Sequence, residues 1–204
     1  HFCAGADITE LRAARAADER PFSDVVDGAE RALAELPKPT VAFISGDCIG
    51  GGCSIAIDCD LRIATTDARF GITPARLGIV YPSGALERAM QLLGPAATKR
   101  MLFTGDLIDA QEAHRVGLVD EVVDAATGET HLATLTGTLA ARSLVTQAAT
   151  KAMVAEIAAH GQVSQAATAH WNHVAAASPD GREGIAAFVE KRQPHFTWSG
   201  SDVD

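Results

Sequence analysis

The stretch Thr40–Asp60, TVAFISGDCIGGGCSIAIDCD, constrains the fold more than any other part of the chain. Its apolar run Val41–Ile44 lies between a proline and a glycine, which predicts a short strand buried on both faces. The glycines Gly50–Gly52 follow as a turn, and they let another group approach the backbone closely. A helix begins inside these glycines and continues through Ser54–Asp60.

A helix that opens on glycines leaves its first backbone N–H groups unpaired at the positive end of its dipole. Such an end can hold an anion or a developing oxyanion. A second glycine turn, Cys3–Asp7, also follows an apolar strand end and precedes a helical stretch. If the two turns face one ligand, each aims one N–H at a carbonyl oxygen and they form an oxyanion hole; two unrelated turns are the alternative.

Composition narrows the possible partners. The 204 residues are 47% hydrophobic, which suits one domain, or slightly more, with a sizeable core. A net charge of −9 argues against nucleic acid and anionic membranes as binding partners, and no apolar run has the length of a membrane span.

The four cysteines show no paired metal spacing, so we expect reduced thiols in a cytoplasmic protein. His170 and His173 lie one helical turn apart with no local carboxylate or cysteine, and we predict no metal site.

The order of elements predicts an α/β fold with a largely parallel sheet in residues 1–127 and a helical subdomain in residues 128–204. The predicted strands are 41–44, 61–65, 69–72 and 118–123, and the four C-terminal helices are 131–142, 144–160, 164–177 and 181–192. In the helix 22–36 we expect one buried stripe, formed by Phe22, Val25, Val26, Ala29, Ala32, Leu33 and Leu36. Apolar helices in a small terminal unit favour oligomerisation. Because the chain opens abruptly on what looks like a strand end, we also expect further sequence upstream of residue 1.

Four motifs carry a resemblance to a known family: HFCAGADITEL, PTVAFISGDCIGGGCSIAIDCDLRIAT, TGDLIDAQEAHRVGLVDEVV and EGIAAFVEKRQPHF. Together they resemble the enoyl-CoA hydratase/isomerase (crotonase) superfamily over nearly the whole chain and in the family's order. The resemblance implies a ClpP/crotonase spiral of ββα turns, a homotrimer or a hexamer built as a dimer of trimers, and an acyl-CoA substrate. Coenzyme A is then part of the substrate, and no separate cofactor is expected.

The resemblance also implies roles for individual residues. The oxyanion-hole N–H groups would be those of Ala6 and Gly51, with the thioester carbonyl between them. Phe188 and Lys191 match the terminal segment that helps to cover CoA, although Lys191 can also be a solvated lysine. The remaining substrate or CoA positions are Ala4, Gly5, Asp7, Ile8, Gly50, Pro74 and Arg76.

The chain departs from the family where hydration chemistry needs two carboxylates. The first glutamate position is Ser54 and the second is Pro74, and Gly78 keeps the register of the second. Enolate chemistry by isomerisation, decarboxylation or atypical hydration remains open. Relocated acid–base candidates are Tyr81, Arg76, Asp58 and Glu87, each of which has a structural reading: a packing tyrosine, an ion-pair arginine or a helix-end carboxylate.

Two other functions compete with an acyl-CoA enzyme. A catalytically silent acyl-CoA-binding homologue would keep the glycine turns without the carboxylates. A Rossmann dehydrogenase would need Gly-x-Gly-x-x-Gly, but the residues from Gly46 read Gly-Asp-Cys-Ile-Gly-Gly-Gly. The sequence therefore favours the acyl-CoA enzyme.

Overall fold

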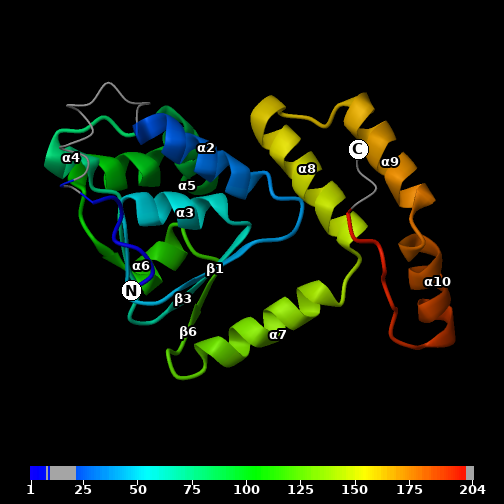
Figure 1. The fold of residues 1–204 in the computed structure, drawn as a ribbon. Coiled ribbons are helices and arrows are strands. Elements are labelled where there is room, and N and C mark those ends of the chain that lie inside the picture. Colours follow the sequence, from blue (N-terminus) through cyan, green and yellow to red (C-terminus); the bar gives the residue numbers. More distant parts are fainter. Residues whose placement is uncertain (8, 10–21, 201–204) are drawn as a thin grey trace. The chain divides into compact units, whose positions relative to one another are not determined.

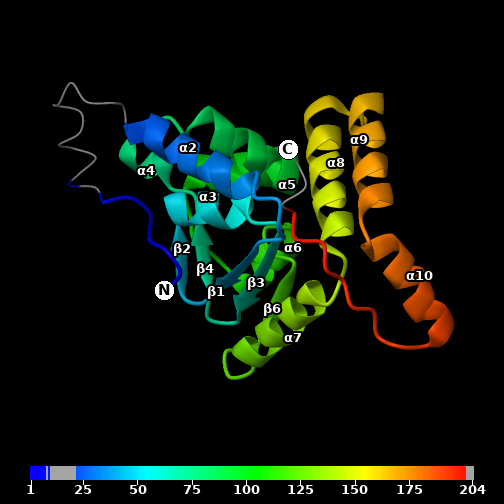
Figure 2. The same ribbon diagram turned by 45° about the vertical axis from the view of Figure 1, so that its right-hand side comes forward.

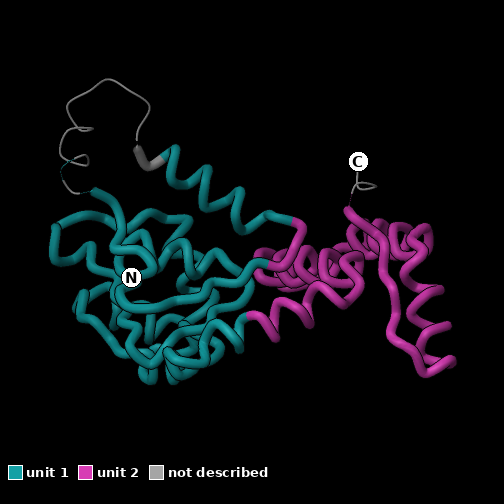
Figure 3. The backbone as a smooth tube through the Cα atoms, turned by 60° about the horizontal axis from the view of Figure 1, so that its bottom comes forward, with its two compact units in different colours: residues 1–36, 40–132 teal, residues 37–39, 133–204 magenta. Residues whose placement is uncertain are grey.

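The computed structural model describes residues 1–7, 9 and 22–200. The chain divides into two compact units, which Figure 3 colours separately. The first unit comprises residues 1–36 and 40–132, and the second comprises residues 37–39 and 133–204.

The first unit contains two three-stranded sheets where the sequence predicts one largely parallel sheet. One has the order β1-β3-β6 and is parallel throughout, whereas the other has the order β2-β4-β5, with β4 and β5 antiparallel. The strands are β1 Val41–Ile44, β2 Asp47–Ile49, β3 Leu61–Thr65, β4 Arg69–Gly71, β5 Ile108–Asp109 and β6 Glu121–Val123. A turn at Gly46, with φ 67°, carries the chain from β1 into β2.

Strand β1 corrects a second expectation, because it is not buried on both faces. Ala42 and Ile44 are buried, whereas Val41 and Phe43 are half-buried, so the strand alternates. Strand β3 lies between β1 and β6, and it is buried at each of its last four residues. The central position in this sheet is therefore occupied by β3, the third strand along the chain.

Helices gather beside these strands. Figures 1 and 2 show α2, α3 and α5 together on one side of β1 and β3, and both α2 and α5 pack against α3. The helices of the first unit are α2 Phe22–Ala34, α3 Gly51–Asp58, α4 Pro74–Leu77, α5 Ser83–Thr104 and α6 Ala110–Arg115. Helix α5 is interrupted at Gly94, just before Pro95. Asp109 caps α6 by accepting a hydrogen bond from the Glu112 N–H.

Helix α2 presents a different face to the protein from the one expected. Val25, Ala29, Ala32 and Leu36 are exposed, so the predicted stripe is wrong at those positions. Glu30 is instead only 6% exposed. The helix is thus rotated so that a carboxylate faces inward.

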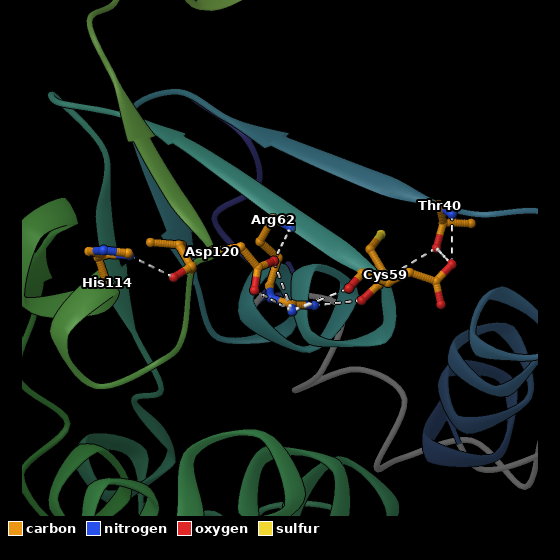
Figure 4. A network of polar contacts seen from close by, with 7 residues as sticks. Thr40, Cys59, Arg62, His114 and Asp120 are labelled. Atoms are coloured by element: carbon orange, nitrogen blue, oxygen red, sulfur yellow. Dashed lines mark hydrogen bonds and ion pairs between the residues drawn. The ribbon is translucent and has the colours of Figure 1, made fainter. Parts of the chain in front are cut away.

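A polar network fastens β3 to its neighbours, and Figure 4 shows it from close by. The Arg62 guanidinium donates to the Cys59 carbonyl at 2.6 Å and to Asp120 at 3.1 Å. Asp120 also accepts from the Arg62 backbone N–H, and the Thr40 N–H and hydroxyl donate to Asp60. We refer to Arg62, Asp120 and the Cys59 and Asp60 carbonyls as the Arg62 network.

The second unit is helical. Helix α7 Gly128–Ala140 starts in the first unit and continues into the second, which also holds α8 Leu144–His160, α9 Gln165–Ala177 and α10 Asp180–Glu190. Val145, Ala148, Val174 and Trp198 form its small core. The Asp180 carboxylate accepts from the Ser143 hydroxyl and from two backbone N–H groups of the C-terminal segment. Among the described residues, no helix combines the length and apolar character needed to cross a membrane.

Candidate active site

The two glycine turns lie side by side. The first residues of the chain run parallel to β2, and the backbones of Cys3 and Cys48 pair in an isolated parallel β-bridge. The Cys3 N–H donates to the Asp47 carbonyl at 3.1 Å, and the Ile49 N–H donates to the Cys3 carbonyl at 2.9 Å. This short ladder makes the Cys3–Asp7 turn end next to the glycines that open α3.

Glycine is required at the point of contact. A Cβ placed on Gly5 would lie 3.0 Å from the Ile49 carbonyl oxygen and 3.2 Å from the Gly51 nitrogen, and Gly5 has φ +91°. A Cβ on Gly52 would lie 2.2 Å from the Cys3 carbonyl oxygen, closer than any real Cβ contact. The backbones therefore approach to distances that only these glycines allow.

Helix α3 begins with backbone N–H groups that lack an acceptor within the described residues. Its N-cap is Gly50, with φ 59°, and no described side chain caps the helix. Across the described part of the chain, the N–H groups of Gly51 and Ala6 have no hydrogen-bond acceptor. The helix dipole adds positive potential at the same place, so this end of α3 suits an oxyanion.

Ser54 lies one helical turn after Gly51, on the same face of α3. It is 4% exposed, and its hydroxyl is 2.9 Å from the Tyr81 hydroxyl. Burial raises the pKa of Tyr81 to about 12, so the phenol stays protonated at neutral pH. The sequence singled out both residues, and the structure brings them together.

Beside this pair is a group of charges that we call the Arg88 cluster: Arg88, Glu30 and Asp58. Arg88 on α5 donates to Glu30 on α2 at 2.5 Å, and its Nε contacts the Asp58 carboxylate on α3. The Arg88–Asp58 contact lacks hydrogen-bond geometry, so both Asp58 oxygens stay without a hydrogen-bond partner among the described residues.

Burial dominates the titration of both carboxyls. It raises the pKa of Asp58 to about 7, against the opposing charge of Arg88. Burial likewise raises the pKa of Glu30, and Arg88 and the Ser54 hydroxyl oppose the rise while Asp27 adds to it. Carboxyls with perturbed pKa values next to a polar pair are typical of functional sites.

Sequence reasoning missed Glu30 and Arg88. Asp58, offered by the sequence both as an acid–base candidate and as a helix-end residue, is the last residue of α3, and its buried side chain contacts Arg88. One signal was available: Glu30 falls four residues after Val26 and three before Leu33, so it shares a helical face with apolar residues. A charge on such a face predicts a buried partner.

Other predicted residues lie elsewhere. Pro74 is the first residue of α4, and Arg76 pairs with Asp106 at 3.2 Å on the surface. Arg76 also lines a cavity of about 460 Å³ whose walls do not include Ser54 or Tyr81. Ala4 and Asp7 are exposed beside Gly5, and Glu87 is exposed on α5.

Three predicted CoA positions belong to the second unit or lie outside the described residues. Phe188 and Lys191 are exposed in the second unit, where Lys191 ends α10 with φ 55°. Ile8 lies outside the described residues. Their proposed contacts with CoA remain predictions.

The fold and the paired glycine turns define the class: a crotonase-like α/β protein with ββα units and C-terminal helices. The family model described as enoyl-CoA hydratase/isomerase matches residues 1–199, and the chain belongs to that family.

Individual relatives agree with this assignment. The chain is 32% identical over 197 residues to a crotonyl-CoA hydratase of Syntrophomonas wolfei, covering 96% of the chain and 75% of the relative. It is 42% identical over 123 residues to a short-chain-enoyl-CoA hydratase of Clostridium acetobutylicum, covering 60% of the chain and 47% of the relative. A crystal structure of an enoyl-CoA hydratase/isomerase family member matches with a TM-score of 0.89 at 38% identity, covering 98% of this chain and 76% of that one. The chain thus spans only part of each relative.

Proposed function

We propose that the chain is an acyl-CoA enzyme that stabilises a thioester enolate between the N–H groups of Ala6 and Gly51. The observation that carries the proposal is the contact of the two glycine turns, with the Gly51 nitrogen 3.2 Å from the Cβ position of Gly5. Two unpaired N–H groups from adjacent turns can share the negative charge that develops on a thioester oxygen. Family membership supports an acyl-CoA as the ligand.

The reaction is an isomerisation, a decarboxylation or an atypical hydration. Ordinary hydration needs one carboxylate to activate water and a second to deliver a proton. Ser54 and Pro74 occupy those two positions in this chain, and Ser54 is hydrogen-bonded to Tyr81 rather than to a carboxylate. The Ser54–Tyr81 pair is therefore the proposed catalytic pair at the reacting carbons.

The remaining assignments extend this proposal. CoA lies along Ala4–Ile8, with Gly50, Pro74 and Arg76 as further contacts, and Phe188 and Lys191 cover it. The active form is a homotrimer or a hexamer. Four free cysteines fit a cytoplasmic, reducing compartment.

Two measurements test the function. Calorimetry with butyryl-CoA measures binding, and mass spectrometry in D₂O measures exchange of its Cα hydrogens, a reaction that needs only an enolate and a proton acceptor. We expect binding with exchange, and slow or undetectable loss of crotonyl-CoA absorbance. Binding without exchange would identify a silent acyl-CoA-binding homologue, the alternative that the missing glutamates favour. Absence of butyryl-CoA binding would refute both the acyl-CoA enzyme and the silent acyl-CoA-binding homologue.

A further inference from the structure

The first unit contains a cavity that the proposed acyl-CoA site does not explain. It is the cavity of about 460 Å³ beside Arg76, and its volume is typical of cavities that bind small molecules. Its walls belong to α4, to the part of α5 after Gly94, to β5 and to α6, and none of the described residues of α3 or of the Cys3–Asp7 turn lines it. The cavity is therefore separate from the two glycine turns and from the Ser54–Tyr81 pair.

Much of the cavity wall is apolar. The apolar residues that line it are Ala97, Met101, Leu107, Ile108 and Val116. Met101 is buried in the core, and the Leu107 side chain packs directly on Gly71, where a Cβ would have no room. The core thus holds these side chains in place, and together they can bury an apolar ligand body.

Two arginine–carboxylate pairs line the same cavity. Arg76 pairs with Asp106 at 3.2 Å, and Arg100 pairs with Glu112 at 3.0 Å. Both arginine side chains are more than half exposed, and the Asp106 side chain is 71% exposed. Exposed ion pairs contribute little to stability. Each guanidinium can therefore leave its partner for a ligand anion at small cost.

Glu112 keeps a partner even when Arg100 leaves it. Arg115 donates to the two oxygens of the Glu112 carboxylate, at 2.6 Å and 2.7 Å. These hydrogen bonds are the main cause that lowers the pKa of Glu112, and Arg100 adds less. The two lining pairs together with Arg115 carry one positive charge in excess, in a chain whose net charge is −9. That excess favours a ligand with a single negative charge.

We propose that this cavity binds an amphipathic carboxylate, a molecule that carries one carboxylate on an apolar body such as a medium-length alkyl chain. Arg100 and Arg76 donate to the carboxylate, because a guanidinium matches its geometry with paired hydrogen bonds, and the apolar walls enclose the body. Asp106 then turns to water, and Glu112 stays with Arg115. The inference does not depend on the proposed function. Arg76 is also a proposed CoA contact, so the test rests on Arg100, which has no role in that site.

The test is isothermal titration calorimetry with octanoate, and octanamide serves as the neutral analogue of the same length. We expect one octanoate per chain, bound about 10-fold more tightly than octanamide, with a preference that shrinks as salt rises. Arg100→Met keeps an apolar stem but removes the charge, so octanoate should bind about 10-fold more weakly while octanamide binding changes little. Arg31→Met, at an exposed arginine on α2, is the matched control and should bind octanoate as wild type does.

Ala97→Phe supplies a second variant, because a phenyl ring at this half-buried wall position fills the cavity. It should abolish binding of octanoate and octanamide alike, and circular dichroism checks that the protein is folded. If Ala97→Phe does not fold, the exposed Arg100→Met decides alone. Absence of octanoate binding to wild type, equal affinity for octanoate and octanamide, or wild-type octanoate affinity in either folded variant would overturn the proposal. Displacement of octanoate by excess butyryl-CoA would place it in the acyl-CoA site and overturn the separate cavity site, while leaving the proposed function intact.

Discussion

Arg62 and Arg88 both hold carboxylates inside the first unit, but they do so in different ways. The Arg62 guanidinium donates to two backbone carbonyls and to Asp120, whose side chain is 39% exposed. Arg88 faces two buried carboxylates, and the Asp58 oxygens lack hydrogen-bond partners among the described residues. The Arg62 network ties backbone segments together, whereas the Arg88 cluster keeps poorly solvated charge beside a hydroxyl pair.

The difference indicates what each cluster is for. A buried cation whose terminal nitrogens donate to two backbone carbonyls and to Asp120 fixes the positions of β3 and its neighbours. A cluster with one cation, two desolvated carboxyls and raised pKa values can change its protonation state near neutral pH. Substitutions in the two clusters test this contrast.

Loss of Arg88 should have the largest effect. Arg88→Met leaves Glu30 and Asp58 buried without their cation, which should lower the free energy of unfolding by about 3–5 kcal/mol at pH 8. The loss should shrink toward pH 5, because Asp58, whose pKa is raised to about 7, becomes neutral there. Urea denaturation at the two pH values measures it, and an equal loss at both would contradict the account.

Loss of Arg62 should cost less and depend less on pH. Arg62→Met deprives the Cys59 and Asp60 carbonyls of a donor, but Asp120 is exposed enough to be hydrated. We expect a loss of about 2–3 kcal/mol, nearly equal at pH 5 and pH 8. A loss that depends on pH as steeply as that of Arg88→Met would erase the distinction between the two clusters.

Asp58 should make the wild-type protein less stable at high pH. Its folded pKa of about 7 lies above its ordinary value of 3.8, so the folded state binds more protons between these values. The free energy of unfolding should therefore fall as pH rises through that window. Asp58→Asn should flatten this slope and stabilise the protein by roughly 2 kcal/mol at pH 8. A slope unchanged in Asp58→Asn, measured beside the exposed control Glu35→Gln, would rule out this assignment.

The Ser54–Tyr81 hydrogen bond should have the smallest effect on stability. Ser54→Ala leaves the Tyr81 hydroxyl without its partner and should lower the free energy of unfolding by about 1 kcal/mol. Exchange of butyryl-CoA should fall far more, since Ser54 is half of the proposed catalytic pair. Thermal unfolding and the exchange assay, run on the same preparation, separate the two effects. Equal exchange in Ser54→Ala and wild type would remove Ser54 from the chemistry.

Local signals predicted much of the fold. Strand β3 and helix α8 have the bounds that their apolar pattern and flanking residues indicate, because each is determined by its own segment. Strand β2 was missed, since its three residues are held by pairing with β4 and with the start of the chain. Its sequence, Asp-Cys-Ile between glycines, carries no strand pattern of its own.

The residues of the candidate site also fall into those that local sequence indicates and those that only tertiary packing brings together. Gly51, Ser54 and Tyr81 could be named because they follow motifs, and the roles of Ala6 and Gly51 remain predictions. Glu30 and Arg88 could not be named, since their meeting depends on how α2 and α5 pack on α3. The rotation of α2 that exposes Val25 and buries Glu30 is a tertiary choice between two faces.

The central claim is that two backbone N–H groups hold a thioester oxygen, and infrared spectroscopy of bound crotonyl-CoA labelled with ¹³C at the carbonyl tests it directly. Gly51 is the first residue of α3, a position where proline fits a helix but offers no N–H. We predict a lower carbonyl frequency in wild type and in Gly51→Ala, whose Cβ has room at 3.8 Å from the Gly5 Cα, and a smaller shift in Gly51→Pro. Bound crotonyl-CoA with the frequency of the free thioester in wild type would contradict the account.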